Sequence, residues 1–154
     1  MIQPAARRLW REELGIEMEL HAIEAQVFWG MEARVEFQMS SSSWVADYND
    51  ANTFLGMFLT GDGNNQTGWS NARYDELVHA ANETADLARR EQLFQQAETI
   101  LVRDELPILP LYLYTGINYF DTNRITGIWQ NVLDDHPLNT IRKVRGAVAR
   151  VSGN

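Results

Sequence analysis

The sequence predicts an α/β fold, because segments of helical periodicity alternate along the chain with segments of strand periodicity. In residues 3–14, and again after Asn71, apolar side chains recur every three or four residues, which is typical of helices. Residues 16–21 and 35–39 instead alternate apolar and polar side chains, as half-buried strands do. The 154 residues suit one domain or a large part of one.

The first elements are predicted by their end signals as well as by periodicity. Pro4 suits the first turn of a helix over residues 3–14, and Gly15 suits the left-handed position that follows a helix end. We expect a strand over residues 16–21 and a short helix over residues 24–32. The first residues therefore indicate a helix rather than a cleavable leader, as in a chain excised from a longer protein.

The middle of the chain begins with a second predicted strand, residues 35–39, which leads into four consecutive serines. A short helix is expected from Asp50 to Phe58, with Asp50 or Asn52 as its cap. Residues 60–68 are dense in glycine, asparagine and aspartate and must form a loop.

Two longer helices and then a strand-like region are expected in the second half. Ser70 or Asn71 caps the first helix, and Asp86 caps the second, which reaches about Arg103 with Leu87 among its inward residues. Residues 107–114 are apolar and β-prone, but prolines restrict them to a strand start or a sheet edge. Short strand-like pieces occupy residues 118–141.

Composition excludes several functional classes. The net charge of −8 makes binding to nucleic acid or to an anionic membrane surface unfavourable. The chain has no cysteine, which excludes disulfides and thiol catalysis. His21, His79 and His136 are far apart and show no ligand spacing, so we expect no metal and no cofactor.

An acid framed by aromatic residues is the strongest candidate site. Asp47 follows Trp44 by three residues and directly precedes Tyr48. A carboxylate between aromatic walls suits the capture of a cationic group. The same residues also suit a strand end that enters a turn. Asp47 and Asp50 together leave open a third reading, a hydrolase with paired carboxylates.

An ordered series of motifs carries a family resemblance. The series is Leu14–Glu17, Trp44–Asp50, Thr53–Leu55, Asn65–Asn71, Tyr74–Leu77, Arg90, Ala97–Leu101, Leu106–Tyr112 and Gly127–Ile128. From about residue 3 to 143 the chain resembles the C-terminal part of the oligopeptide- and dipeptide-binding proteins of ABC importers, the extracytoplasmic solute-binding proteins of family 5.

The resemblance implies a partial lobe of a type II periplasmic-binding-protein fold. Residues 1–143 would be a fragment of the C-terminal lobe, residues 144–154 a flexible tail, and the N-terminal portion of the protein would be missing. The implied location is periplasmic, or on the outer face of the cytoplasmic membrane. The implied partners are a peptide and a membrane permease, and the exposed half-cleft makes self-association of the fragment an expectation.

The resemblance also assigns roles to individual residues of a protein that is not an enzyme. Asp47 would pair with the α-amino group of the peptide, Trp44 would line a side-chain pocket, and Tyr114 would approach the ligand. Tyr48, the aromatic residue next to Asp47, is the fourth predicted ligand-binding residue. Some relatives carry an arginine where this chain has Ser41, so contacts of that guanidinium are not carried over. Other relatives bind nickel complexes, haem or oligosaccharides, which leaves a non-peptide ligand as the alternative.

Overall fold

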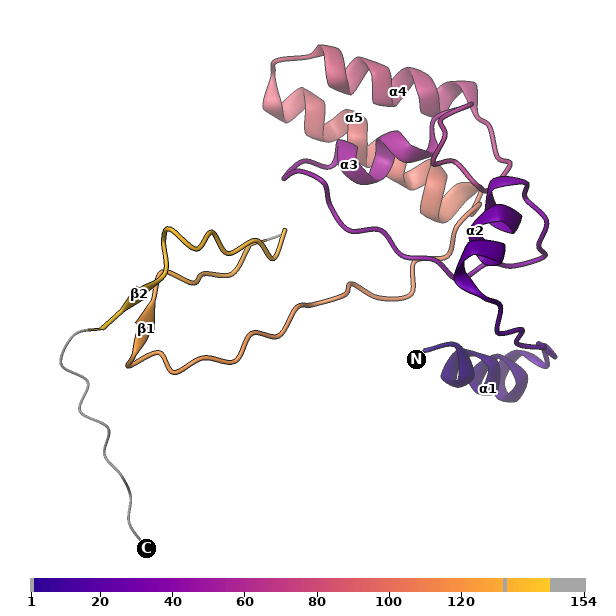
Figure 1. The fold of residues 1–154 in the computed structure, drawn as a ribbon. Helices are drawn as coiled ribbons and strands as arrows, with labels where there is room; N and C mark the ends of the chain where they lie inside the picture. Colours follow the sequence, from indigo (N-terminus) through magenta and orange to yellow (C-terminus); the bar gives the residue numbers. More distant parts are fainter. Residues whose placement is uncertain (1, 132, 145–154) are drawn as a thin grey trace, which may run out of the picture.

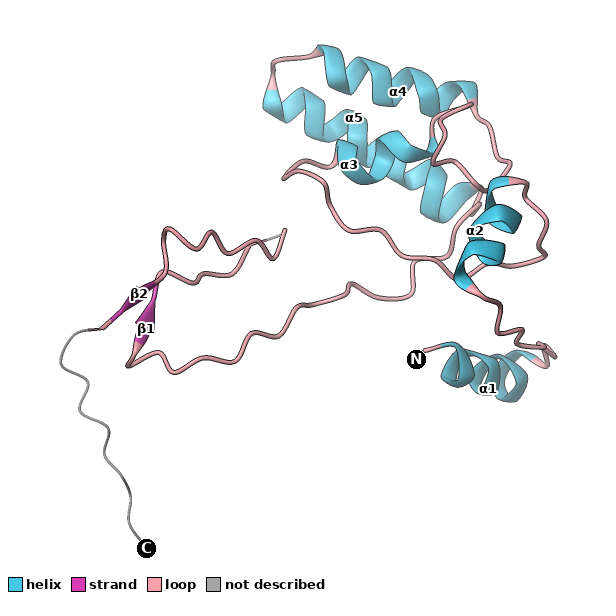
Figure 2. Cartoon of the chain, in the orientation of Figure 1, coloured by secondary structure: helices cyan, strands magenta, loops and turns pink. Residues whose placement is uncertain are grey.

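The structure is a computed structural model that describes residues 2–131 and 133–144 (Figure 1). Helices and turns form the packed part, and two very short strands lie apart from it (Figure 2). The elements in chain order are α1 (Gln3–Leu14), α2 (Ala25–Ala33), α3 (Asn52–Leu55), η1 (Gly56–Phe58), α4 (Ala72–Glu83), α5 (Leu87–Thr99), η2 (Ile100–Asp104), β1 (Ile125–Thr126) and β2 (Arg142–Lys143). No helix within the described ranges is long and apolar enough to cross a membrane.

The hydrophobic core lies where α3 packs against the helices α4 and α5 (Figure 1). The two longer helices run antiparallel and are joined by a short turn. Small residues such as Ala81 and Ala97 are fully buried, which lets the helices approach closely. The buried core residues are Leu55, Tyr74, Leu77, Val78, Ala81, Leu93, Phe94, Ala97 and Leu101.

Helix α4 begins at the predicted cap and is centred on a buried tyrosine. The Asn71 side chain accepts the N–H of Tyr74 at 2.9 Å. The Tyr74 hydroxyl donates to the carbonyl of Leu55 at 2.6 Å, which ties α4 to α3. Burial raises the pKa of Tyr74 above its ordinary value, so the hydroxyl stays protonated and able to donate. Trp69 packs edge-on against the Tyr74 ring, with 5.0 Å between ring centroids.

Helix α5 also begins at its predicted cap, because Asp86 accepts the N–H groups of Ala88 and Arg89. The prediction that Leu87 points inward is wrong: as the first helical residue it lies outside the contact with α4 and is 78% exposed. The helix ends in the π-helical turn η2, where the N–H of Glu105 donates to the carbonyl of Ile100 at 3.0 Å.

The two helices near the N-terminus agree with prediction. Gly15 takes a left-handed φ of 67° after α1, and its N–H bonds the carbonyl of Arg11. Glu24 caps α2 by accepting from the first turn. Helix α1 buries no residue, and a hydrogen bond of 2.9 Å from Gln3 Nε2 to Ser41 Oγ joins it to the serine run.

Three predicted strands are absent from the described part of the chain: residues 16–21, 35–39 and 107–114 are extended or bent without ladder partners. A strand needs hydrogen bonds from a neighbour, and the sheet found here contains only β1 and β2. Val35 also has a φ of 54°, a left-handed conformation that breaks an extended run at its start.

Of the short strands expected in residues 118–141, the structure shows only β1, which pairs antiparallel with β2 among the described residues. Ile125 faces Lys143 and Thr126 faces Arg142 across the β1–β2 pair. Gly127 follows β1 with a φ of 85°, and a Cβ there would lie 1.9 Å from the carbonyl oxygen of Thr140. Of the predicted tail, residues 145–154 lie outside the described residues.

Candidate functional site

The segment of residues 44–50 connects an extended stretch to α3 and contains three of the four predicted ligand-binding residues. Ala46 is buried, and the N–H of Asp47 donates to Thr53 Oγ1 at 3.0 Å. Thr53 is itself buried in α3. The backbone at Asp47 is therefore fixed against the helix while the side chain stays exposed.

Asp47 presents a carboxylate that is close in sequence to two half-exposed aromatic residues. Its side chain has no hydrogen bond or ion pair with any residue in ranges 2–131 and 133–144. Trp44 is 39% and Tyr48 is 45% exposed, so both rings can contact a ligand. An unpaired carboxylate next to aromatic faces attracts an ammonium group.

Tyr48 is held by a chain of two asparagines. Asn52 Nδ2 donates to the Tyr48 hydroxyl at 2.8 Å, and Asn82 Nδ2 on α4 donates to Asn52 Oδ1 at 2.8 Å. Gly56 leaves room for this amide, because a Cβ there would lie 3.1 Å from Asn52 Oδ1. Sequence reasoning missed Asn82, because no pattern connects two asparagines thirty residues apart.

Asp50 differs from Asp47 because it is committed to an ion pair. Arg90 Nη1 lies 2.5 Å from Asp50 Oδ2, and Arg90 Nη2 lies 2.8 Å from Asp50 Oδ1. The hydrogen bonds from Arg90 lower the pKa of Asp50, and those to Asp50 raise the pKa of Arg90. Asp50 Oδ1 also accepts the N–H of Asn52 at 2.8 Å. Both oxygens are therefore occupied, whereas a paired-carboxylate hydrolase needs two acids free for substrate and water.

Tyr114, the fourth predicted ligand-binding residue, lies outside the 44–50 segment. Tyr114 is 83% exposed on the extended segment that leaves the helices and runs toward β1 (Figure 1). No hydrogen bond within the described residues joins it to Trp44, Asp47 or Tyr48. Its ligand contact stays a prediction.

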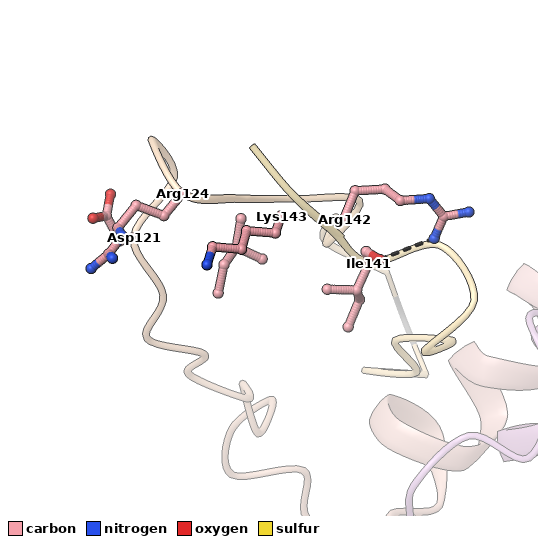
Figure 3. Close-up of a pocket in the computed structure, with 6 residues that line it drawn as sticks. Asp121, Arg124, Ile141, Arg142 and Lys143 are labelled. Atoms are coloured by element: carbon pink, nitrogen blue, oxygen red, sulfur yellow. Dashed lines mark hydrogen bonds between the residues drawn. The ribbon is translucent and has the colours of Figure 1, made fainter. Parts of the chain in front are cut away.

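An open depression of about 410 Å³ lies beside the β1–β2 pair (Figure 3). Its lining is Asp121, Arg124, Ile125, Ile141, Arg142 and Lys143, none of which is a predicted site residue. One guanidinium there is engaged locally, since Arg142 Nη1 donates to the carbonyl of Ile141 at 3.0 Å. We place the site at residues 44–50 on their chemistry rather than at this depression, whose basic side chains are exposed.

Comparison with known proteins gives consistent relatives in sequence and in structure. The chain is 36% identical over 140 residues to the dipeptide-binding protein DppE of Bacillus subtilis, covering 91% of this chain and 24% of DppE. It is 33% identical over 103 residues to the probable deoxycholate-binding periplasmic protein YgiS of Escherichia coli, covering 67% and 19%. No protein-family model matches the chain.

The fold matches a solved binding protein. The unliganded open form of the periplasmic murein tripeptide binding protein MppA superposes with a TM-score of 0.82 at 26% identity, covering 92% of this chain and 27% of that one. This confirms the expected fold class, a partial lobe of the periplasmic-binding-protein type. The chain spans about a quarter of the length of these relatives, whose names describe binding proteins.

Proposed function

Because this chain matches part of the family 5 extracytoplasmic solute-binding proteins in both sequence and fold, we propose that it forms one wall of a peptide-binding cleft. In this proposal the protein works outside the cytoplasmic membrane, captures peptides by their α-amino group and delivers them to an ABC permease. The remaining part of the same protein supplies the opposite wall, since the chain accounts for about a quarter of its relatives' length.

The contrast between two neighbouring acids carries the proposal. Asp50 is paired with Arg90, whereas the Asp47 side chain has no ion pair within the described residues. An ammonium held by such a carboxylate gains charge-assisted hydrogen bonds, and an aromatic face adds roughly 0.5–2 kcal/mol of cation–π attraction. In this proposal Trp44 lines a side-chain pocket, and Tyr48 and Tyr114 approach the ligand.

The occupied Asp50 supports a binding protein rather than an enzyme. With Arg90 on both of its oxygens, Asp50 does not provide the second free carboxylate that hydrolysis by an acid pair needs. Turnover of a peptide substrate by the purified protein would contradict this part of the proposal.

A non-peptide ligand is the second candidate, favoured by the likeness to a relative named as probably deoxycholate-binding. Deoxycholate carries a carboxylate and no amine, so an unpaired Asp47 would repel its charged end. The two ligand classes therefore predict opposite effects when the charge of Asp47 is removed.

Calorimetry on the full-length protein that contains this segment tests the proposal, with alanine peptides of two to five residues as probes. We expect D47N to weaken binding by about 2–5 kcal/mol, because the ammonium loses its charged partner in a closed cleft. N-acetylation of the peptides is expected to weaken binding to the parent protein similarly. The matched control D104N changes an exposed acid on η2.

Three results would contradict the proposal. The first is no binding of any alanine peptide, and the second is equal binding of free and acetylated peptides. The third is binding of deoxycholate that strengthens in D47N, which would favour the second candidate.

A further inference from the structure

Resting on the proposed function of Asp47, we propose that Arg90 of α5 is a positioning residue for the ligand's amino group. Its guanidinium fixes Asp50, the C-terminal end of the loop that carries Asp47, and thereby sets where the Asp47 carboxylate stands in the cleft. Arg90 itself makes no contact with the ligand in this proposal.

The loop from Ala46 to Asp50 is tethered at both ends and at its centre. Ala46 is buried at one end, and the Asp47 N–H is held by Thr53 Oγ1. Within the loop, the N–H of Asp50 donates to the carbonyl of Tyr48 at 2.9 Å. At the other end, the N–H of Thr53 donates to the carbonyl of Asp50 at 3.2 Å. The position of Asp47 therefore depends on that of Asp50 in two ways: through the connecting backbone, and through Thr53, which is hydrogen-bonded to both residues.

Arg90 is a rigid support for this loop because its own guanidinium is fixed on three sides. Two nitrogens bind the two oxygens of Asp50, and Nε donates to the carbonyl of Ala81 at 3.2 Å. The Cζ atom lies 4.7 Å from the centroid of the Phe94 ring, within cation–π distance. Side-chain exposures of 23% for Arg90 and 27% for Asp50 keep the pair partly shielded from water. Because the planar Arg90 guanidinium is held by core residues in this way, it fixes the position of Asp50 relative to the core.

The proposal makes a specific prediction about which ligands are affected. Loss of the Arg90 guanidinium leaves Asp50 without its charge partner. The loop of residues 46–50 then becomes more mobile, and the Asp47 carboxylate no longer keeps a fixed position. Sites whose supporting contacts are loosened keep their residues but lose the geometry that makes them selective. The affinity for a ligand with a free amine should then fall, whereas the affinity for a ligand with an acetylated amine should change much less.

The test compares R90Q, R90K and D50N with the parent full-length protein, using alanine peptides of two to five residues in free and N-acetylated form. We expect R90Q and D50N to lower the ratio of the two affinities roughly tenfold. R90K is expected to recover part of the loss, because an ammonium pairs with one oxygen but lacks the fork. R73Q serves as the matched control, because Arg73 pairs with Glu76 on the exposed face of α4.

D50N keeps the proposal testable if R90Q fails to fold, because it leaves the Arg90 contacts to Ala81 and Phe94 in place. A purely structural role for Arg90 would weaken both peptide forms equally and leave the affinity ratio unchanged. That result would overturn the proposal.

Amide hydrogen exchange separates this proposal from the proposed function, because it needs no ligand. We expect the amides of residues 47–53 to exchange faster in R90Q and D50N, while those of Leu77 and Val78 in the core of α4 keep their protection. If no alanine peptide binds the parent protein, the proposed function fails, and exchange still decides whether Arg90 fixes the loop. Unchanged exchange at residues 47–53 would overturn the positioning role.

Discussion

The helices α3 to α5 and the extended segment of residues 107–124 show how differently two parts of one chain are stabilised. The helices satisfy their backbone groups internally and, together with Leu101 of η2, bury a continuous core of nine residues. The extended segment is equally apolar, yet most of its large side chains, such as Leu113 and Tyr119, are exposed. Helical hydrogen bonds are local, whereas a strand depends on a neighbour that lies elsewhere. Apolar composition alone therefore does not make a core.

The largest effect on the free energy of unfolding is expected when the same leucine-to-alanine truncation is made in each of the two regions. L77A removes a side chain that is 2% exposed, and we expect it to lower the free energy of unfolding by about 2–5 kcal/mol. L113A removes one that is 94% exposed, so the expected change is within about 0.5 kcal/mol. Urea denaturation of the 154-residue chain measures both. A large loss in L113A would show that residues 107–124 are packed after all.

We expect a smaller effect of pH on the free energy of unfolding, because the ion pair that joins the 44–50 segment to α5 depends on the charge of Asp50. Arg90 lowers the pKa of Asp50 in the folded state below its ordinary value of 3.8. The stabilisation is therefore fully present above pH 4 or so and is lost as the pH falls through the folded-state pKa. We expect it to be worth about 1 kcal/mol at neutral pH, because the pair is only partly buried.

Thermal unfolding of the parent chain and of D50N between pH 2 and 7 or so measures this contribution. The two stabilities should converge at the acid end and diverge above it. A constant difference over the whole range would contradict the link to the ionisation of Asp50. E76Q is the control, since its partner Arg73 forms an exposed pair on α4.

The smallest effect on global stability is expected at the β1–β2 pair. G127A places a Cβ against the Thr140 carbonyl and forces alanine into a φ of 85°, so we expect the strand pairing to be lost. The free energy of unfolding of the helical core should change by less than about 0.5 kcal/mol. Backbone NMR shifts near Ile125 report the first effect, and urea denaturation reports the second. G63A is the control, because nothing lies within 4 Å of its added Cβ.

Most signals that act over one or two turns of chain were predicted correctly from the sequence; the exception is α3, whose N-cap is Ala51 without a side-chain cap instead of Asp50 or Asn52. The caps at Asn71 and Asp86 and the left-handed Gly15 are all used as expected, because each acts on backbone within a few residues of itself. Alternation in residues 16–21 shows which side chains share a face, but it supplies no partner strand, and none is present among the described residues.

The candidate site was predictable only in part, for the same reason. Asp47 stands out because its aromatic neighbours are adjacent in the sequence. The Asp50–Arg90 pair spans forty residues, and an acid and an arginine at that separation carry no signal in a chain rich in both. Whether Tyr114 belongs to the site depends on tertiary contacts between its extended segment and residues 44–50, which no sequence pattern predicts.

Glu105 joins the entrance and the exit of the α4–α5 hairpin. Its two carboxylate oxygens accept from Trp69 Nε1 at 2.6 Å and from Asn71 Nδ2 at 2.5 Å. The segments that enter and leave the hairpin are therefore joined by the hydrogen bonds of one side chain, Glu105. A mechanical pull on the flanking segments would load these two hydrogen bonds before it reached the packed helices. We expect these two hydrogen bonds to be loaded first when the segments on either side of the hairpin change position.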